Sequence, residues 1–213
     1  MTVVVLEVGA KKVFASALDW PGWVRSGRTD EAALDALADY RERYAEVVGE
    51  AGLALPLDEP FEVTERLPGT STTDFGAPDV MATRERAALS AADAERVARL
   101  VGASWTVFDR VYAASAAELV KGPRGGGRDR DSVAQHVVNA EFRYARKFGL
   151  VLPTPSIGDV GALAEERSAV LQALRSATGP VDAEAKGWSP AYAARRIAWH
   201  VLDHAWEMQD KQP

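Results

Sequence analysis

The sequence contains no cysteine among its 213 residues. This excludes disulfide bonds, zinc–thiolate clusters and a thiol nucleophile supplied by the chain itself, and it suits a reducing compartment. Long apolar runs are also missing, since the longest aliphatic run, VVVL at 3–6, falls far short of the ~20 residues that span a bilayer. The first residues lack the layout of a signal peptide. We therefore expect a cytoplasmic protein with no membrane partner.

Basic residues are in short supply as well. The chain has 25 Lys and Arg against 31 Asp and Glu, a net charge of -6, and a pI near 5.2. A non-specific nucleic-acid binder needs a basic face for the phosphates, so we expect no nucleic-acid partner. A Gly-x-Ser-x-Gly elbow, a dinucleotide fingerprint and an EF-hand loop are also absent from the sequence, which excludes the chemistry these motifs carry.

The first part of the chain, 1–67, has the pattern of a small α/β domain. Its β-branched and alternating stretches predict strands, and a helix is expected to begin after Thr29, with acidic residues in its first turn. The predicted strands lie at 3–8, 12–18, 23–26 and 61–65, and the helix runs from 30 to 49–52. This β-β-(β)-α-β order predicts one helix that covers one face of a small antiparallel sheet.

Within this part, the stretch ASALDWPGWVRSGRTDEAALDAL resembles the HicB-like fold, a small antitoxin-type domain. In that family an extended segment links a hairpin to a helix. The matching residues are Pro21, Gly22, Ser26, Gly27, Thr29, Glu31 and Ala32. The resemblance implies a domain that binds a partner, although the DNA-binding half of an antitoxin has no counterpart in this sequence.

The remainder is predicted to be helical. The composition of 68–80, rich in Pro, Gly, Ser and Thr, marks a boundary, and we assign 68–89 as a linker. The residues of 68–80, about a dozen, are enough to cross a domain surface in extended form. Helical periodicity and caps predict four helices, at 91–119, 132–148, 158–176 and 189–210. The basic, glycine-rich stretch 121–130 is predicted to be a further linker. Four such helices favour a four-helix bundle over 90–213, so the expected fold class is α+β.

The three histidines of the sequence all lie on predicted inward helix faces. His200 and His204 are four residues apart, which places both imidazoles on one side of a helix, and His136 lies on the helix at 132–148. If these two helices are neighbours, the three rings converge. Neutral imidazole suits Zn, Ni, Cu or Fe, and three protein ligands leave a coordination position open. The alternative is that each histidine is an ordinary polar residue at the edge of the core.

The segments QHVVNAE and WHVLDHAWE resemble the DinB-like family of metal-binding four-helix bundles. There, one histidine of the second helix joins an HxxxH pair of the fourth, which implies His136, His200 and His204 as metal ligands here. The resemblance further implies a divalent metal, with zinc or nickel expected first. Some relatives are transferases or isomerases that use a low-molecular-weight thiol, mycothiol-dependent maleylpyruvate isomerase among them. Since this chain lacks cysteine, such a thiolate would come from a cosubstrate that reacts with a small-molecule substrate.

Residues near the histidine pair offer supporting roles. Asp203 and Glu207 are candidates for orienting an imidazole or for acid–base chemistry, or they pair with nearby Arg or Lys side chains. Arg195 is a candidate for holding a substrate carboxylate, or else it forms a salt bridge. Trp199 and Trp206 share a helix face distinct from that of the histidines, and this face would allow packing against the N-terminal domain or a homodimer.

Three functions stay open from the sequence. The first is a metal-dependent thiol S-transferase or isomerase, motivated by the three-ligand site. The second is a non-catalytic interaction or regulatory protein, in which the edge strands of the HicB-like sheet pair with a partner. The third is a histidine-based metal carrier, which the sequence does not separate from the first.

Overall fold

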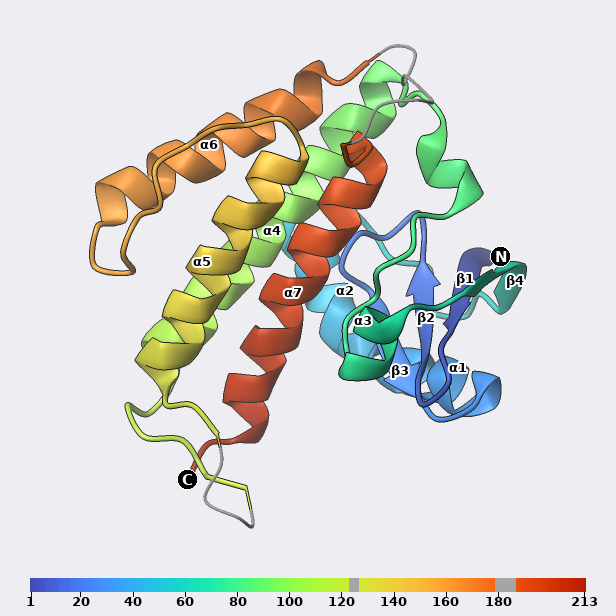
Figure 1. Ribbon diagram of the computed structural model, residues 1–213, viewed down its shortest axis with the longest axis horizontal. Coiled ribbons are helices and arrows are strands. Elements are labelled where there is room, and N and C mark those ends of the chain that lie inside the picture. The colour runs from blue at the N-terminus through green and yellow to red at the C-terminus, as the bar shows by residue number, and fades with distance from the viewer. Residues whose placement is uncertain (123–126, 179–186) are drawn as a thin grey trace.

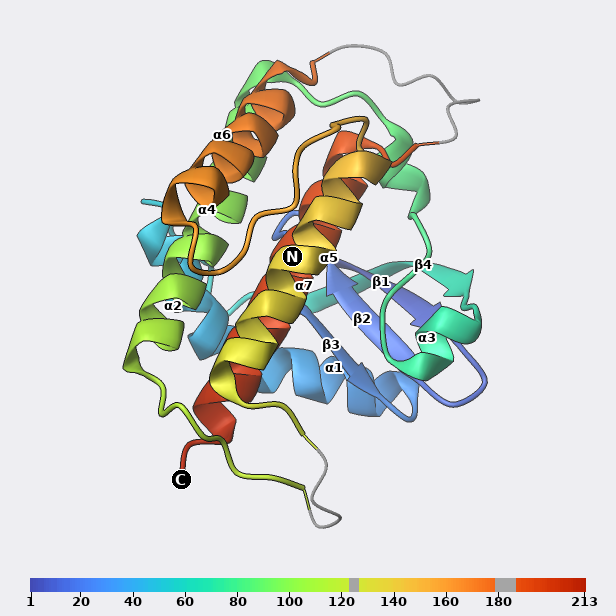
Figure 2. The ribbon, with the colours of Figure 1, turned by 60° about the vertical axis from the view of Figure 1, so that its left-hand side comes forward.

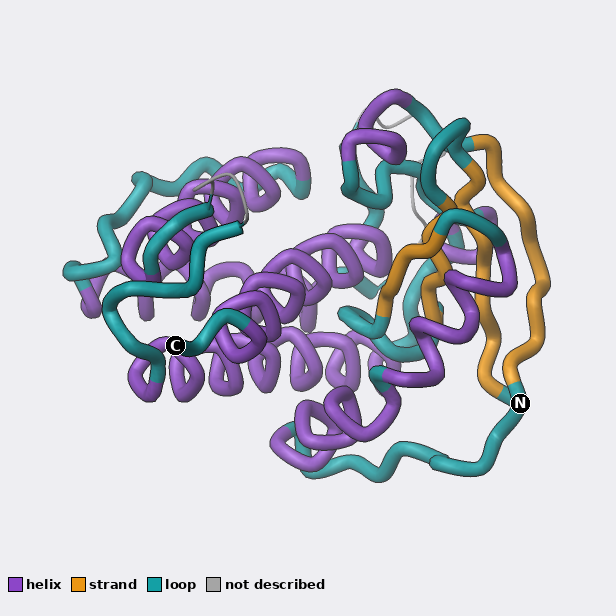
Figure 3. Tube along the Cα trace, turned by 90° about the horizontal axis from the view of Figure 1, so that it is seen from below, coloured by secondary structure: helices purple, strands orange, loops and turns teal. Residues whose placement is uncertain are grey.

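The computed structural model describes residues 1–122, 127–178 and 187–213 of a mixed α+β protein. Its strands gather at one side and its long helices at the other (Figures 1 and 3). The strands are β1 (Thr2–Val8), β2 (Val13–Ala17), β3 (Val24–Gly27) and β4 (Phe61–Pro68). The helices are α1 (Asp30–Asp39), α2 (Arg41–Glu50), α3 (Ser71–Phe75), the 3-10 helix η1 (Thr83–Arg86), α4 (Ala91–Ala114), α5 (Arg130–Lys147), α6 (Val160–Ser176) and α7 (Pro190–Asp210).

The sheet has the strand order β3-β2-β1-β4. β2 pairs antiparallel with β1 and with β3, whereas β4 pairs parallel with β1. The expectation of an antiparallel sheet is therefore wrong for the last strand. The reason is that α1 and α2 carry the chain back across the sheet, so β4 starts at the same end as β1 and runs in the same direction.

The single helix expected from 30 to 49–52 is divided in two at Tyr40. This residue ends α1 and precedes α2 with φ -91° and ψ 4°, outside regular helix geometry. Its ring packs edge-on against Trp206 at a centroid distance of 5.0 Å, and the Arg25 guanidinium lies 3.8 Å from its centroid. These tertiary contacts accompany the break, which redirects α2 towards α4.

The two faces of β2 are buried against different partners. Val13, Ala15 and Ala17 join the main hydrophobic core, while Phe14 lies in a separate cluster with Trp199 of α7. This alternation agrees with the pattern in the sequence. Trp199 and Trp206 are 4% and 3% exposed, so the aromatic face that the sequence offered to a second copy is covered by the N-terminal part of the same chain.

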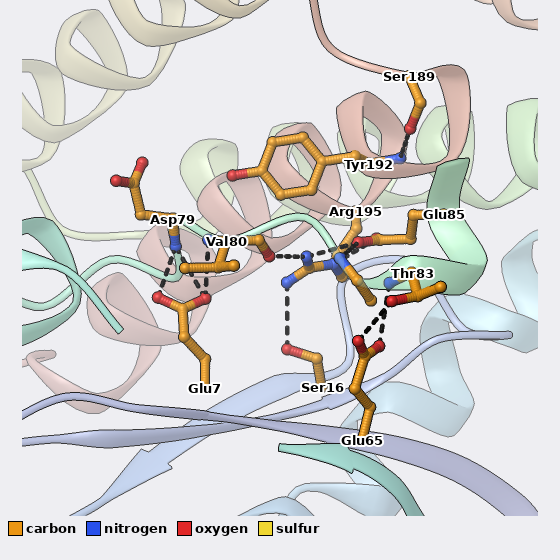
Figure 4. Close-up of polar contacts among 11 residues, drawn as sticks. Glu7, Ser16, Glu65, Asp79, Val80, Thr83, Glu85, Ser189, Tyr192 and Arg195 are labelled. Carbon is orange, nitrogen blue, oxygen red and sulfur yellow. Dashed lines mark hydrogen bonds and ion pairs between the residues drawn. The ribbon is translucent and has the colours of Figure 1, made fainter. Parts of the chain in front are cut away.

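The predicted linker 68–89 contains α3 and η1 and is fixed to the sheet at several points. The Glu7 carboxylate accepts hydrogen bonds from the backbone N–H groups of Asp79 at 2.9 Å and Val80 at 3.0 Å and from the Thr73 hydroxyl. Figure 4 shows the contacts of Glu7 with Asp79 and Val80 beside those of Glu65 and Arg195. The expectation of an extended crossing is therefore wrong, because a buried acid on β1 organises the segment.

The helical part is arranged around α7. This helix packs against both α4 and α5, and α6 packs against α4 (Figures 1 and 2). The helix expected at 91–119 ends earlier, where Ser115 adopts extended backbone angles and its hydroxyl bonds to the Val111 carbonyl at 2.8 Å. Of the expected linker 121–130, residues 123–126 lie outside the described part. No helix within the described ranges is both long and apolar enough to cross a membrane.

Candidate metal centre

Of the two helices that carry the histidines, α7 begins at a side-chain cap, whereas α5 has no side-chain capping hydrogen bond at its start within the described residues. Ser189 precedes α7 and its hydroxyl accepts a hydrogen bond from the Tyr192 N–H at 3.3 Å, with Pro190 in the first position. Proline is favoured there because its missing N–H would have had no partner. α5 begins at Arg130, directly after Asp129, rather than after Asp131 as its acidic side chain had suggested. Both helices are regular through their histidines, which therefore keep helical spacing.

The three imidazoles meet between α5 and α7, because the two helices are neighbours in the structure. Nε2 of His136 lies 3.2 Å from Nε2 of His200. The ring centroids of His200 and His204 are 4.6 Å apart, and those of His136 and His204 are 5.0 Å apart. One potential ligand atom from each ring lies within 4.8 Å of the other two. All the histidines of the sequence thus occupy one site.

This geometry fits a tetrahedral metal. Two imidazole nitrogens bound at about 2.0–2.1 Å to a tetrahedral ion lie about 3.4 Å apart, close to the 3.2 Å between His136 and His200. Nδ1 of His204 lies 2.6 Å from the Glu207 carboxylate, so Nε2 is the nitrogen left to face an ion. A carboxylate that fixes the far nitrogen of a ligating histidine is the usual outer partner in such sites.

The electrostatics keep ligand lone pairs available at neutral pH. Burial lowers the pKa of His136 to about 4. Burial also lowers the pKa of His200 well below its ordinary value, with the nearby His204 adding to the shift. Both rings are then neutral near pH 7, the form that binds metal ions. The hydrogen bond with His204, followed by one from Lys211, lowers the pKa of Glu207 to about 2, so its carboxylate is ionised.

Of the other predicted candidates, one lies in this site and two form contacts elsewhere. Glu207 lies in the site and also accepts from Lys211 at 2.5 Å. Asp203 points to the sheet instead and pairs with Arg25 at 2.9 Å. Arg195 is buried in an ion pair with Glu85 at 2.6 Å (Figure 4), away from the histidines. The structure thus gives Arg195 the salt-bridge role that the sequence had left open.

Arg196 is a residue that the sequence reasoning did not single out. It lies one turn before His200, and its Nη2 donates to the Tyr144 hydroxyl at 3.2 Å. The Tyr144 ring in turn lies 5.6 Å from the His200 ring, centroid to centroid. The sequence did contain a signal for this residue, because residues 196, 200 and 204 repeat every four positions and share one helix face.

No protein-family model, curated protein or solved structure matches the chain.

Proposed function

We propose that the protein binds a divalent metal ion, zinc or nickel first, through His136, His200 and His204. The observation that carries this proposal is the convergence of three imidazoles, two of them held neutral by burial. In the competing interpretation, the rings form only a hydrogen-bonded cluster. Such a cluster satisfies the Nε2 atoms of His136 and His200 with one shared proton, but it gives no reason for a third ring with its far nitrogen fixed by Glu207.

We further propose that the helices α4 to α7 form a DinB-like bundle and that the sheet with α1 and α2 is HicB-like. Support for the first comes from the positions of the ligands, with His136 on the second long helix and the HxxxH pair on the fourth. Support for the second comes from the order of the first elements, a hairpin followed by a Pro-Gly turn and a helix capped by Thr29.

The proposed activity is that of a thiol-dependent transferase or isomerase. A divalent ion held by three protein ligands keeps a coordination position open and lowers the pKa of a bound water or thiol. Glu207 holds the Nδ1 proton of His204 and so fixes the orientation of that ring. Because the chain has no cysteine, the thiol is a low-molecular-weight cosubstrate.

Metal content tests the proposal directly. Tag-free protein purified from metal-replete cells should contain about one equivalent of a divalent ion by mass spectrometry, and His200→Ala should lose it. Asp203→Asn on the same helix is the matched control, because Asp203 pairs with Arg25 outside the site. Circular dichroism establishes that each variant is folded. Wild-type protein with below about a tenth of an equivalent would overturn the proposal.

A second candidate function rests on β4. This strand forms one edge of the sheet, with β1 as its partner and most of its side chains exposed, so its free edge is suited to pairing with a strand of another protein. Such a regulatory protein would capture a specific partner and show no turnover on thiol–electrophile pairs. A metal carrier would instead bind the ion and exchange it rapidly. Homodimerisation would need a surface other than the covered face of Trp199 and Trp206.

A further inference from the structure

Arg196 is a buried cation beside the candidate metal centre. Its side chain is 4% exposed. Nη2 donates to the Tyr144 hydroxyl, a neutral group. Nε and Nη1 are also buried, and neither has a hydrogen-bond partner within residues 1–122, 127–178 and 187–213. In those same ranges no carboxylate forms an ion pair with it.

Burying a guanidinium without a counter-charge carries a large cost in free energy. Arginine does not lose its proton in proteins, so it cannot avoid the cost of burial by becoming neutral. A buried charge is normally paired or fully hydrogen-bonded. The surroundings of Arg196 are instead aromatic, with the guanidinium carbon 5.3 Å from the centroids of Tyr144 and Trp199 and 5.5 Å from that of Trp188. Ring faces attract a cation but leave its outward N–H groups without an acceptor.

His200 presents a second unsatisfied group next to this cation. Its Nδ1 is buried and has no partner in the described part of the chain. A histidine that binds a metal through one nitrogen usually donates the other N–H to an oxygen acceptor, as His204 does towards Glu207. The His200 ring lies beside two of the three aromatic rings around Arg196, with centroid distances of 5.6 Å to Tyr144 and 5.9 Å to Trp199.

We propose that Arg196 binds the carboxylate of a small ligand whose other end reaches the metal centre, with Nδ1–H of His200 as a further donor. This inference rests on the proposed function and narrows it to a carboxylate-bearing thiol or substrate. One oxyanion would neutralise the cation and occupy the free N–H groups on both side chains. A carboxylate suits the site because it is planar and matches the planar fork of a guanidinium.

A pair of probes that differ only in charge tests the inference. Co²⁺-loaded protein is titrated with 3-mercaptopropionate and with its methyl ester, and binding is followed by Co²⁺ absorption. The wild type should bind the acid about tenfold more tightly than the ester or better, since hydrogen bonds to charged groups are the strong ones. Arg196→Gln should remove this preference, while Arg146→Gln, an exposed arginine on α5, should keep it.

Several outcomes would overturn the inference. Equal affinity of the wild type for acid and ester, or an unchanged preference in Arg196→Gln, would do so. Inorganic phosphate that displaces the acid more strongly than propionate does would overturn the assignment to a carboxylate. If Arg196→Gln does not fold, Arg196→Met takes its place, since it fills similar volume without a charge.

Metal uptake is measured on each variant first, so failure of the two proposals can be told apart. Wild type that binds no Co²⁺ contradicts the metal centre and leaves Arg196 to be tested alone. In that case the metal-free protein is titrated with propionate, and the fluorescence of Trp188 and Trp199, which flank Arg196, reports binding. A response lost in Arg196→Gln supports the anion site, and the absence of any response in the wild type contradicts it.

Discussion

Arg195 and Arg196 are adjacent on α7 and equally deep in the protein, yet their surroundings differ completely. The guanidinium of Arg195 donates to Glu85 at 2.6 and 2.8 Å, to the Val80 carbonyl at 2.9 Å and to the Ser16 hydroxyl at 3.3 Å. Every nitrogen of that group has a partner, whereas Arg196 has one neutral partner among the residues that the structure describes. Arg195 is thus a buried charge that stabilises the fold, whereas we propose that the contacts of Arg196 are completed by a ligand.

A similar difference separates the sheet from the interior among the helices. On the sheet side, the buried Glu7 carboxylate accepts two backbone N–H groups and a hydroxyl. On the helix side, both carboxylate oxygens of the buried Glu166 lack partners within the described ranges. Burial, with the nearby charge of Glu141, raises the pKa of Glu166 to about 7. The buried acid at the sheet is thus hydrogen-bonded at both oxygens, whereas Glu166 among the helices has no hydrogen-bond partner within those ranges.

The largest effect should come from Glu85→Ala. Removing this carboxylate leaves Arg195 buried without its counter-charge, which typically costs about 3–5 kcal/mol of the free energy of unfolding. Arg196→Met removes a cation that has no counter-charge in the described part of the chain, so it should leave that free energy unchanged or higher. Urea denaturation of both variants measures the difference. Equal losses in the two would contradict the contrast between the two arginines.

Glu166→Gln should stabilise the protein at alkaline pH. The pKa of Glu166 is about 7 in the folded state against 4.5 ordinarily, so folding favours the protonated form, and its contribution to stability declines as the pH rises from 4.5 through 7. A neutral amide avoids this decline, so the variant should gain about 1–3 kcal/mol over the wild type at pH 8 compared with pH 4.

Denaturation curves between pH 4 and pH 8 provide the measurement for this variant. Glu165→Gln is the matched control, because Glu165 is the exposed neighbour on the same helix, and its stability relative to wild type should change little with pH. A difference between Glu166→Gln and wild type that is independent of pH would show that Glu166 ionises as an ordinary surface carboxyl does.

Glu207→Gln should weaken metal binding without abolishing it. The amide still reaches His204 but no longer holds the Nδ1 proton with a charged acceptor, and loss of such an outer partner typically lowers metal affinity about tenfold or more. Competition with a chromophoric chelator measures the affinity, with Asp203→Asn as the control on the same helix. Unaltered affinity in Glu207→Gln would mean that the carboxylate has no part in orienting the ring.

The smallest effect is expected at the Arg25–Asp203 pair. The two side chains are 21% and 40% exposed and 2.9 Å apart, so solvent screens their attraction, and such pairs are usually worth less than about 1 kcal/mol. Asp203→Asn should therefore change the urea midpoint only slightly, and less at high salt. A loss as large as that of Glu85→Ala would remove the distinction between exposed and buried ion pairs at this interface.

The features that periodicity governs could be predicted from the sequence. The ranges of α5 to α7 and the shared face of His200 and His204 follow from a repeat of 3.6 residues, because that repeat fixes which side chains share a face. The contact between α5 and α7, which brings His136 to the pair, was a condition that the sequence left open. The parallel direction of β4 and the break at Tyr40 could not be predicted. They depend on a crossover and on a contact with Trp206, far away in the sequence.

The histidines of the candidate site could be predicted from the sequence, but the residues around them could not. The spacing of Arg196 to His200 was visible in the sequence, but the neutral and aromatic contacts that Arg196 makes depend on Tyr144 of α5 and on Trp188. Similarly, the composition of 68–89 indicated a loop, whereas its attachment to Glu7 joins residues more than sixty positions apart. Side-chain pairing between distant segments is set by the fold rather than by local pattern.

α7 both carries His200 and His204 and packs against the N-terminal part of the chain. This double role restricts how the protein can be shortened or recombined. A fragment of 90–213 would carry all three histidines, but Trp199 would lose Phe14 and Trp206 would lose Tyr40. Two large apolar rings would then face water on the back of the helix that holds the site, which favours aggregation. Gene fusions that exchange the sheet for an unrelated module would meet the same difficulty, so α7 and the sheet are best transferred as one unit.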